Sequence, residues 1–137
     1  MAYWLFKSEP GAWSWDDQVA AGTEGWDGIR NYQADNNMKA MKVGDKAFFY
    51  HSVDERRIVG VVEVAREHYP DSTDPKDRFG MVDVKAVMPV KSPVTLADIK
   101  AEPALANLAL VRQSRLSVVP IAPAEWKLLC KMAGIKP

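Results

Sequence analysis

The sequence predicts an α+β fold, a small mixed β-barrel of five or six strands with short helices in the connections and a C-terminal helix. Two observations support this prediction. Segments with the alternation or the apolar runs of β-strands are interleaved with short segments at helical spacing. Turn clusters separate these segments, and no repeat, low-complexity tract or linker interrupts the 137 residues. We therefore expect a single domain that spans residues 1–137.

Five segments predict β-strands, because each is rich in β-branched or aromatic residues and most are bounded by turn residues. In chain order they are residues 3–7, 46–52, 57–65, 81–90 and 115–121. Residues 53–56 predict a hairpin, and residues 68–80 predict a turn-rich loop. Gly60 predicts a bulge or a close backbone approach within its strand. Pro89 predicts the end of its strand, because proline cannot donate to a β-ladder.

Four short helices are predicted by start signals in front of helical spacing. The residues that mark these starts are Ser14, Asn31, Thr95 and Pro123. The first and third are each followed by an aspartate three residues later, which is a capping-box pattern. Gly22 and Gly134 predict where the first and last helices stop. In the second helix, Ala34, Met38 and Met41 recur at helical spacing and predict a buried face.

Cys130 is the only cysteine, which excludes an intramolecular disulfide and favours the cytoplasm. It recurs at helical spacing with Trp126, Leu129 and Ala133, so we expect it to pack in the core. No apolar stretch approaches the roughly 18 residues of a membrane span, and no membrane association is expected. The two histidines lack zinc-site motifs and the aspartates of residues 71–77 lack the calcium-loop pattern, so neither a metal nor another cofactor is expected.

The charges balance overall but are unevenly distributed. The chain has 18 basic and 18 acidic residues, yet residues 1–90 carry a net charge of −4 and residues 91–137 one of +4. Proteins that bind long stretches of nucleic acid by neutralising phosphates are usually strongly basic. A nucleic acid partner would therefore have to be recognised largely by a local pocket.

The stretch W-D-G-I-R-N-Y-Q-A-D-N-N (26–37) predicts a ligand site. The flat rings of Trp26 and Tyr32 suit stacking on nucleobases, and the amide of Gln33 can both donate to and accept from a base edge. Two interpretations stay open. The stretch is either a recognition site, or Trp26 fills the core while Asn31 caps a helix.

Three further groups of polar residues are weaker candidates. Lys7 and Ser8 end the first predicted strand, where they would line a barrel mouth or a solvated turn. His51 and Ser52 are adjacent, so their side chains point to opposite faces of a strand and do not favour a nucleophile with its base. A hydrogen-bonding role in a pocket is the stronger interpretation for this pair. Arg115 and its neighbour Arg112 would contact phosphate or pair with acidic groups of the N-terminal part.

Several stretches together resemble the EVE domain family, of the thymocyte nuclear protein type, within the PUA-like superfamily and related to the YTH readers of methylated RNA. They follow the family's order and cover the chain almost end to end. The matching residues are 3–10, 26–37, 44–52, 58–64, 69–71, 82–84 and 113–118. The chain departs from the family in the short loop between Y-P-D (69–71) and V-D-V (82–84), where many members have a longer acidic and aromatic loop.

The resemblance implies a PUA-like mixed β-barrel whose pocket accepts a modified base extruded from DNA or RNA, without catalysis. It implies that Trp26 and Tyr32 form aromatic walls. The other expected contacts come from Lys7 and Ser8 at the strand end, Asn31 and Gln33 at the helix start, His51 and Ser52 on the opposite rim, and Arg30 and Arg115 on backbone phosphate.

Three hypotheses of function follow from these features. The first is a cytoplasmic, non-catalytic reader of a modified nucleobase, which as a neutral domain would depend on a longer substrate or a protein partner for tight binding. The second is a small enzyme that acts on a nucleotide or a small acid through His51. The third is a protein-interaction scaffold in which Trp26 and Tyr32 are fully packed and no concave site remains.

Overall fold

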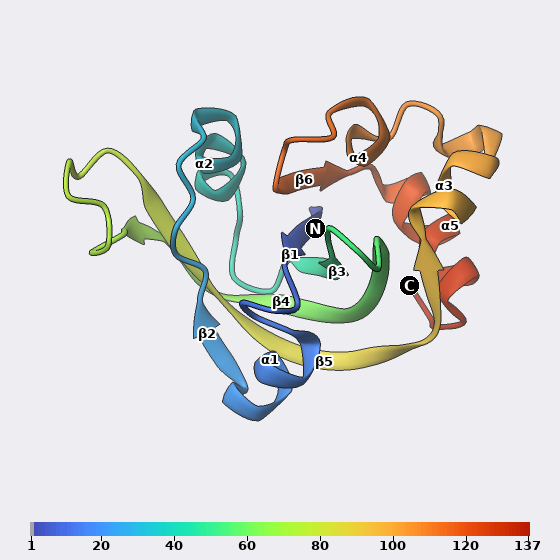
Figure 1. Cartoon of the computed structure of the whole chain (residues 1–137), viewed down its shortest axis with the longest axis horizontal. Helices are drawn as coiled ribbons and strands as arrows, with labels where there is room; N and C mark the ends of the chain where they lie inside the picture. Colours follow the sequence, from blue (N-terminus) through green and yellow to red (C-terminus); the bar gives the residue numbers. More distant parts are fainter. Residues whose placement is uncertain (1) are drawn as a thin grey trace.

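A six-stranded mixed sheet forms the centre of the structure, a computed structural model that describes residues 2–137 (Figure 1). Its strand order is β2-β5-β4-β3-β1-β6. The strands are β1 (Tyr3–Ser8), β2 (Thr23–Gly25), β3 (Lys46–His51), β4 (Arg57–Pro70), β5 (Gly80–Thr95) and β6 (Val118–Ile121). β1 and β3 are parallel, and every other neighbouring pair is antiparallel. The predicted mixed α+β class is thus confirmed.

The sheet is not a closed barrel, which corrects one part of the prediction. Pairing runs from β2 at one edge to β6 at the other, and within the described residues no ladder joins these two strands. Both edge strands are short, with three and four residues. The long strands β4 and β5 supply the curvature instead, because their ladder shifts register at several points and such irregularities bend and twist a sheet.

Residues 2–137 contain five α-helices and one short 3-10 helix, all of them between strands except α5, which follows the last strand. They are α1 (Trp15–Ala21), α2 (Tyr32–Lys39), α3 (Leu96–Ala101), η1 (Pro103–Leu105), α4 (Ala109–Arg112) and α5 (Pro123–Ala133). The predicted capping residues are confirmed: Ser14, Asn31 and Thr95 each accept a backbone N–H of the helix that they precede. Gly134 ends α5 in the left-handed conformation that glycine tolerates.

Two long strands differ from the prediction. β4 continues through Pro70 and β5 begins at Gly80, so both ends of the predicted loop belong to strands and only residues 71–79 are irregular. Pro89 lies inside β5, opposite Gly60, where the ladder is irregular and a missing N–H donor is tolerated. The last strand begins at Val118 rather than at residue 115. Pairing with residues distant in sequence determines where each strand begins and ends, and local sequence carries little information about this pairing.

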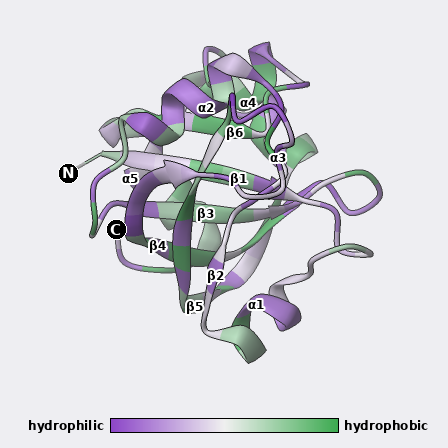
Figure 2. Cartoon of the chain, turned by 90° about the vertical axis from the view of Figure 1, so that its left-hand side faces the viewer, coloured by the Kyte–Doolittle hydropathy of each residue, from purple (hydrophilic) through white to green (hydrophobic). Residues whose placement is uncertain are grey.

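The core lies between the sheet and the helices around it. Figure 2 shows hydrophobic segments within the central strands and hydrophilic ones in many of the outer loops. The predicted buried faces are confirmed, because Ala34, Met38 and Met41 are buried, as is Cys130 on α5. Trp126 of α5 stacks on aromatic rings of both β1 and β3. In Figure 1, α3 and α5 lie toward one end of β5, while α2 lies toward its other end.

Candidate nucleic-acid interface

A cavity of about 450 Å³ opens where β1 ends, beside β2 and the segment that leads into α2. This volume lies within the range of small-molecule sites. Its lining residues are Lys7, Ser8, Glu9, Ala12, Trp13, Glu24, Gly25, Trp26, Asp27 and Ile29. Three of the residues predicted from sequence therefore meet at one cavity, namely Lys7, Ser8 and Trp26.

The end of β1 shapes one wall of the cavity. After Ser8 the chain turns, and the carbonyl oxygen of Glu9 accepts the backbone N–H groups of Ala12 and Trp13 at 3.0 and 2.8 Å. The hydroxyl of Ser8 donates to the carbonyl oxygen of Trp13. These bonds hold Trp13 next to the end of β1, and its side chain therefore lines the cavity.

Trp26 serves the core and the cavity at once. Its backbone N–H donates to the carbonyl oxygen of Val82 at 2.7 Å. Its ring packs on Phe6 and Phe49, with centroids 5.0 and 5.7 Å away, and only 8% of the residue is exposed. The predicted packing of Trp26 in the core is therefore confirmed, and because the residue also lines the cavity its recognition role stays a prediction.

Trp13 is an aromatic lining residue that sequence reasoning missed. Its ring nitrogen donates to Oε1 of Gln18 at 3.0 Å, which fixes the orientation of a half-buried ring. Gln18 is itself fully buried and donates to the carbonyl oxygens of Gly22 and Val84. A tryptophan directly before the helix cap at Ser14, and soon after a polar strand end, is the sequence signal that could have identified it.

The polar lining of the cavity is mainly acidic. Three carboxylates line it, from Glu9, Glu24 and Asp27, together with one ammonium group from Lys7. Oε1 of Glu24 accepts the backbone N–H of Gly25 at 3.1 Å. Nζ of Lys7 donates to the carbonyl oxygen of Ser114 at 2.8 Å, and burial lowers the pKa of its ammonium group. The cavity therefore offers chiefly hydrogen-bond acceptors, which suits a ligand that carries an amino group.

A second, shallower hollow of about 320 Å³ lies next to this cavity. It is lined by Asn31, Gln33, Arg112, Gln113, Ser114, Arg115 and Leu116. Three predicted residues thus lie here instead of in the cavity, namely Asn31, Gln33 and Arg115. The two hollows adjoin, because the bond from Lys7 to Ser114 connects a lining residue of one to a lining residue of the other.

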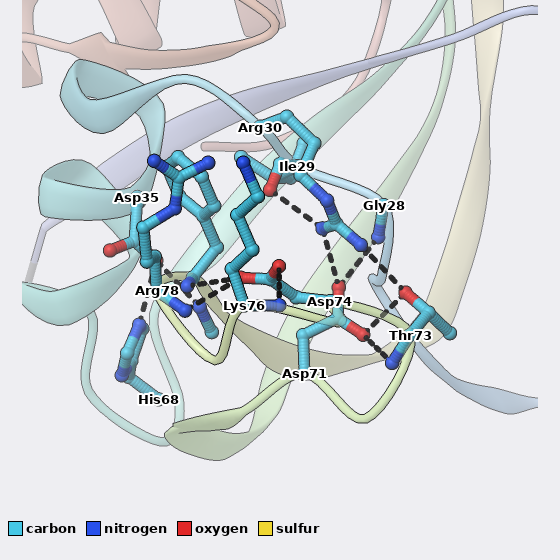
Figure 3. A network of polar contacts seen from close by, with 12 residues as sticks. Gly28, Ile29, Arg30, Asp35, His68, Asp71, Thr73, Asp74, Lys76 and Arg78 are labelled. Carbon is cyan, nitrogen blue, oxygen red and sulfur yellow. Dashed lines mark hydrogen bonds and ion pairs between the residues drawn. The ribbon is translucent and has the colours of Figure 1, made fainter.

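Arg30 and Tyr32 line neither hollow. The guanidinium group of Arg30 donates to Oδ2 of Asp71 at 3.1 Å and to the hydroxyl of Thr73 at 3.0 Å, as Figure 3 shows. It thereby ties the segment before α2 to the loop between β4 and β5. Tyr32 is 58% exposed, and its ring packs on Phe79 of that loop with centroids 4.8 Å apart.

His51 and Ser52 are also outside both hollows. His51 is 8% exposed, its Nε2 accepts the backbone N–H of Trp15 at 3.0 Å, and its Nδ1 is 3.1 Å from Oε1 of Glu55. Ser52 donates its backbone N–H to the carbonyl oxygen of Ser8 at 2.9 Å. His51 thus stabilises the start of α1, and Ser52 stabilises the end of β1. The resemblance had implied that both residues form the opposite rim of the pocket.

Two further properties concern metals and membranes. Among residues 2–137, no group of three or more histidine, cysteine, aspartate or glutamate side chains is placed to hold a metal ion. Within the same residues, no helix has the length and apolar character required to cross a bilayer.

The open sheet thus carries an aromatic, acceptor-rich cavity and an adjoining hollow that contains two arginines, a combination typical of small ligand-binding domains. Comparison with known families identifies the family. The family model described as the EVE domain matches residues 2–132, and the chain belongs to this family.

Relatives of known structure share the fold over nearly the whole chain. A crystal structure of an Agrobacterium tumefaciens protein is 49% identical, with a TM-score of 0.96 over 98% of this chain and 94% of the other. Human THYN1 protein, crystallised in complex with DNA that contains 5-methylcytosine, is 34% identical with a TM-score of 0.90 over 100% of both chains. Thymocyte nuclear protein 1 of Gallus gallus is 36% identical over 98% of this chain and 70% of its own length.

Proposed function

We propose that this chain is a non-catalytic module that binds DNA carrying a modified cytosine, with the base extruded into the cavity of about 450 Å³. The observation that carries the proposal is the combination of two tryptophans and three carboxylates on the cavity wall. A human relative was crystallised with DNA containing 5-methylcytosine, which supports this class of ligand.

The aromatic wall accounts for the energy of base extrusion. Unpairing and unstacking one base costs a few kcal/mol. Stacking on an aromatic side chain contributes about 1 to 3 kcal/mol per base, and Trp13 and Trp26 both line the cavity. The free energy gained by stacking is about equal to the cost of extrusion. Contacts to the base edge and to the DNA backbone therefore determine the affinity.

The carboxylates account for the choice of base. Cytosine presents its N4 amino group as a donor, whereas thymine presents the O4 acceptor at the same position. Glu24 and Asp27 on the cavity wall would accept from the amino group and would repel the thymine oxygen. The 5-methyl group adds about 0.8 kcal/mol where it fills an apolar gap, which is about fourfold in affinity. Discrimination by the methyl group is thus modest, whereas discrimination against thymine is strong.

The adjoining hollow supplies contacts to the DNA backbone in this proposal. Arg112 and Arg115 carry guanidinium groups that bind phosphate oxygens, and the amides of Asn31 and Gln33 add neutral donors beside them. Because the hollow shares the Lys7 to Ser114 contact with the cavity, a nucleotide flanking the extruded base falls within its reach.

The substitution Glu24→Gln tests the proposal most directly, because Trp26→Ala would also remove core packing worth about 3 to 5 kcal/mol. We expect affinity for a duplex with 5-methylcytosine to fall about fivefold to tenfold. The preference for 5-methylcytosine over thymine should shrink further, since the new amide can donate to O4 of thymine. Both bases carry the same methyl group, and the cost of opening each base pair is the same for both proteins, so the change of this ratio from wild type to variant isolates the edge contact. Fluorescence anisotropy at fixed salt measures it.

Glu67→Gln is the matched control. Glu67 is exposed, lies outside the cavity, and like Glu24 accepts one backbone N–H, that of Val43. We expect this variant to bind every duplex as the wild type does. Equal binding of 5-methylcytosine and thymine by the wild type would refute the proposal, and tighter binding of the same modified sequence as RNA would replace DNA with RNA as the ligand.

The two rival hypotheses receive less support from the geometry. Both ring nitrogens of His51 are engaged by protein groups, so the histidine lacks the free nitrogen that a general base requires. The scaffold hypothesis required fully packed aromatic side chains without a concave site, but a cavity lies beside Trp26 and the ring of Tyr32 is exposed.

A further inference from the structure

Tyr32 is an exposed aromatic residue held in a fixed position. The large hydrophobic residues exposed in the described part of the chain are this tyrosine and four valines. Its ring rests on Phe79 with centroids 4.8 Å apart and an interplanar angle of 39°. Phe79 is only 6% exposed, and its backbone N–H donates to Oδ2 of Asp74 at 2.8 Å. The tyrosine therefore projects from the surface on a buried, hydrogen-bonded support.

The backbone of Tyr32 lies close to both hollows. Ile29 lines the cavity and Asn31 lines the second hollow, and Tyr32 follows as the first residue of α2. Three residues of extended chain span at most about 10 Å, which limits the distance between the backbone of Ile29 and that of Tyr32. The exposed ring thus belongs to a residue close to the proposed base site, although it lines neither hollow.

Basic side chains lie close to the aromatic pair. The guanidinium carbon atoms of Arg78 and Arg30 lie 5.7 and 6.0 Å from the centroid of the Phe79 ring. Arg78 and Lys76 are exposed, and in Figure 3 their side chains extend in the same direction from the loop between β4 and β5. The same loop also carries Asp71, Asp74 and Asp77, and Asp71 pairs with Arg30, so Arg78 and Lys76 are the exposed basic groups that the loop offers. An exposed aromatic side chain with basic neighbours is the combination that contacts stacked bases next to phosphates.

We propose that Tyr32 inserts into the DNA duplex at the position vacated by the extruded base, with Arg78 and Lys76 on the adjacent phosphates. This inference rests on the proposed function and assigns the residue that fills the gap. Extrusion leaves two neighbouring base pairs unstacked, and an inserted side chain restores contact on both sides. The rigid support from Phe79 reduces the entropy lost when the ring is inserted.

The test compares Tyr32→Ala and Tyr32→Phe on two forms of one oligonucleotide, the duplex with 5-methylcytosine and its modified single strand. We expect Tyr32→Ala to weaken duplex binding about tenfold, as for the loss of one stacking contact. Single-strand binding should change less than twofold, because a single strand has no gap to fill. Tyr32→Phe should bind like the wild type, because stacking does not require the hydroxyl group.

Val43→Ala is the matched control, because Val43 is equally exposed at 59% and lies beyond the opposite end of α2. A 2-aminopurine base placed next to 5-methylcytosine gives a second readout. Its fluorescence should stay quenched by stacking in the wild-type complex and rise in the Tyr32→Ala complex. Circular dichroism and thermal melting of all variants confirm that they are folded.

The outcomes separate this inference from the function on which it rests. If the wild type fails to distinguish 5-methylcytosine from thymine, the proposed function fails and the inference fails with it. If the wild type distinguishes them but Tyr32→Ala keeps its duplex affinity, or loses duplex and single-strand affinity equally, insertion alone is refuted. Retained base preference with a selective loss on the duplex supports both.

Discussion

One buried carboxylate fixes the loop between β4 and β5, on which the exposed ring of Tyr32 packs. Asp71 has a fully buried side chain and accepts hydrogen bonds from the backbone N–H of Gly28 at 2.9 Å, from Arg30, and from both donors of Thr73. Figure 3 shows these bonds meeting at the carboxylate. The same loop carries Phe79, so this carboxylate connects the segment before α2 to the support of the exposed aromatic ring.

Replacing this carboxylate should lower stability in a pH-dependent way. Burial acts to raise the pKa of Asp71, but the hydrogen bonds from Thr73, Gly28 and Arg30 outweigh it and lower the pKa from 3.8 to about 2. The folded pKa lies below the unfolded one, so the stabilisation is present above pH 3.8 and is lost as the pH falls toward 2. Asp71→Asn should therefore reduce the free energy of unfolding by about 1 to 3 kcal/mol at pH 7.

Urea denaturation at several pH values measures this difference. The gap between wild type and Asp71→Asn should narrow as the pH falls from 4 to about 2, as expected from the pKa shift. A gap of constant size across that interval would contradict the role assigned to the carboxylate.

The single thiol should be inert in the folded protein. Cys130 is fully buried, and burial raises its pKa to about 11 although the ammonium group of Lys46 opposes the shift. The reactive thiolate is therefore scarce near neutral pH and is shielded from reagents. We expect a chromogenic disulfide reagent at pH 8 to label the protein only after denaturant is added. Rapid labelling of one thiol per chain in buffer would show that α5 opens readily.

Sequence reasoning at this scale succeeded where a residue acts on its neighbours. Ser14, Asn31 and Thr95 were predictable caps, because each bonds an N–H group three residues away. Roles that depend on distant partners were not predictable. His51 contacts the backbone of Trp15, and Arg30 contacts Asp71, across 36 and 41 residues of chain.

At the scale of elements, α1 packs against β4 through a close contact at one glycine. A Cβ atom on Gly60 would lie 2.5 Å from the ring of Trp15, the first residue of α1. The sequence predicted either a bulge or a close approach at this position, and both are present, because the ladder between β3 and β4 also shifts register here. The glycine permits the tryptophan ring to lie flat against the sheet.

Gly60→Ala should displace this tryptophan ring and the start of α1. We expect a loss of about 1 to 3 kcal/mol in the free energy of unfolding, because the added methyl group meets a ring packed in the core. Thermal or urea unfolding measures the loss. Gly11→Ala is the control, because a Cβ atom there would meet no atom within 4 Å. Equal stability of the two variants would show that α1 repacks without cost.

The limits of strands were harder to predict than their existence. The segments that form β1, β3, β4 and β5 were all found from composition and alternation. The three residues of β2 were not found, since a short edge strand has no pattern of its own and exists because residues 83–85 of β5 pair with it. This strand carries Glu24 and Gly25 into the cavity, so part of the site depends on a pairing that local sequence does not indicate.

At the scale of the whole molecule, the candidate site is assembled from distant parts of the chain. The cavity combines residues from 7 to 13 with residues from 24 to 29, and the adjoining hollow adds residues from 112 to 116. The sequence resemblance implied one pocket that joins the end of the first strand, Trp26 and the start of the second helix, with Arg115 on backbone phosphate. The structure places Lys7, Ser8 and Trp26 at the cavity but Asn31, Gln33 and Arg115 at the adjoining hollow.

The topology also determines when the site can form during synthesis. β1 is made first, yet it lies inside the sheet between β3 and β6. It cannot be flanked on both sides until Ile121 has been made, when most of the 137 residues are already translated. Lys7 and Ser8 therefore remain without one of the two strands that flank β1 until residue 121 has been translated. A prematurely terminated copy would carry the opening residues of the interface with no cavity to hold a base.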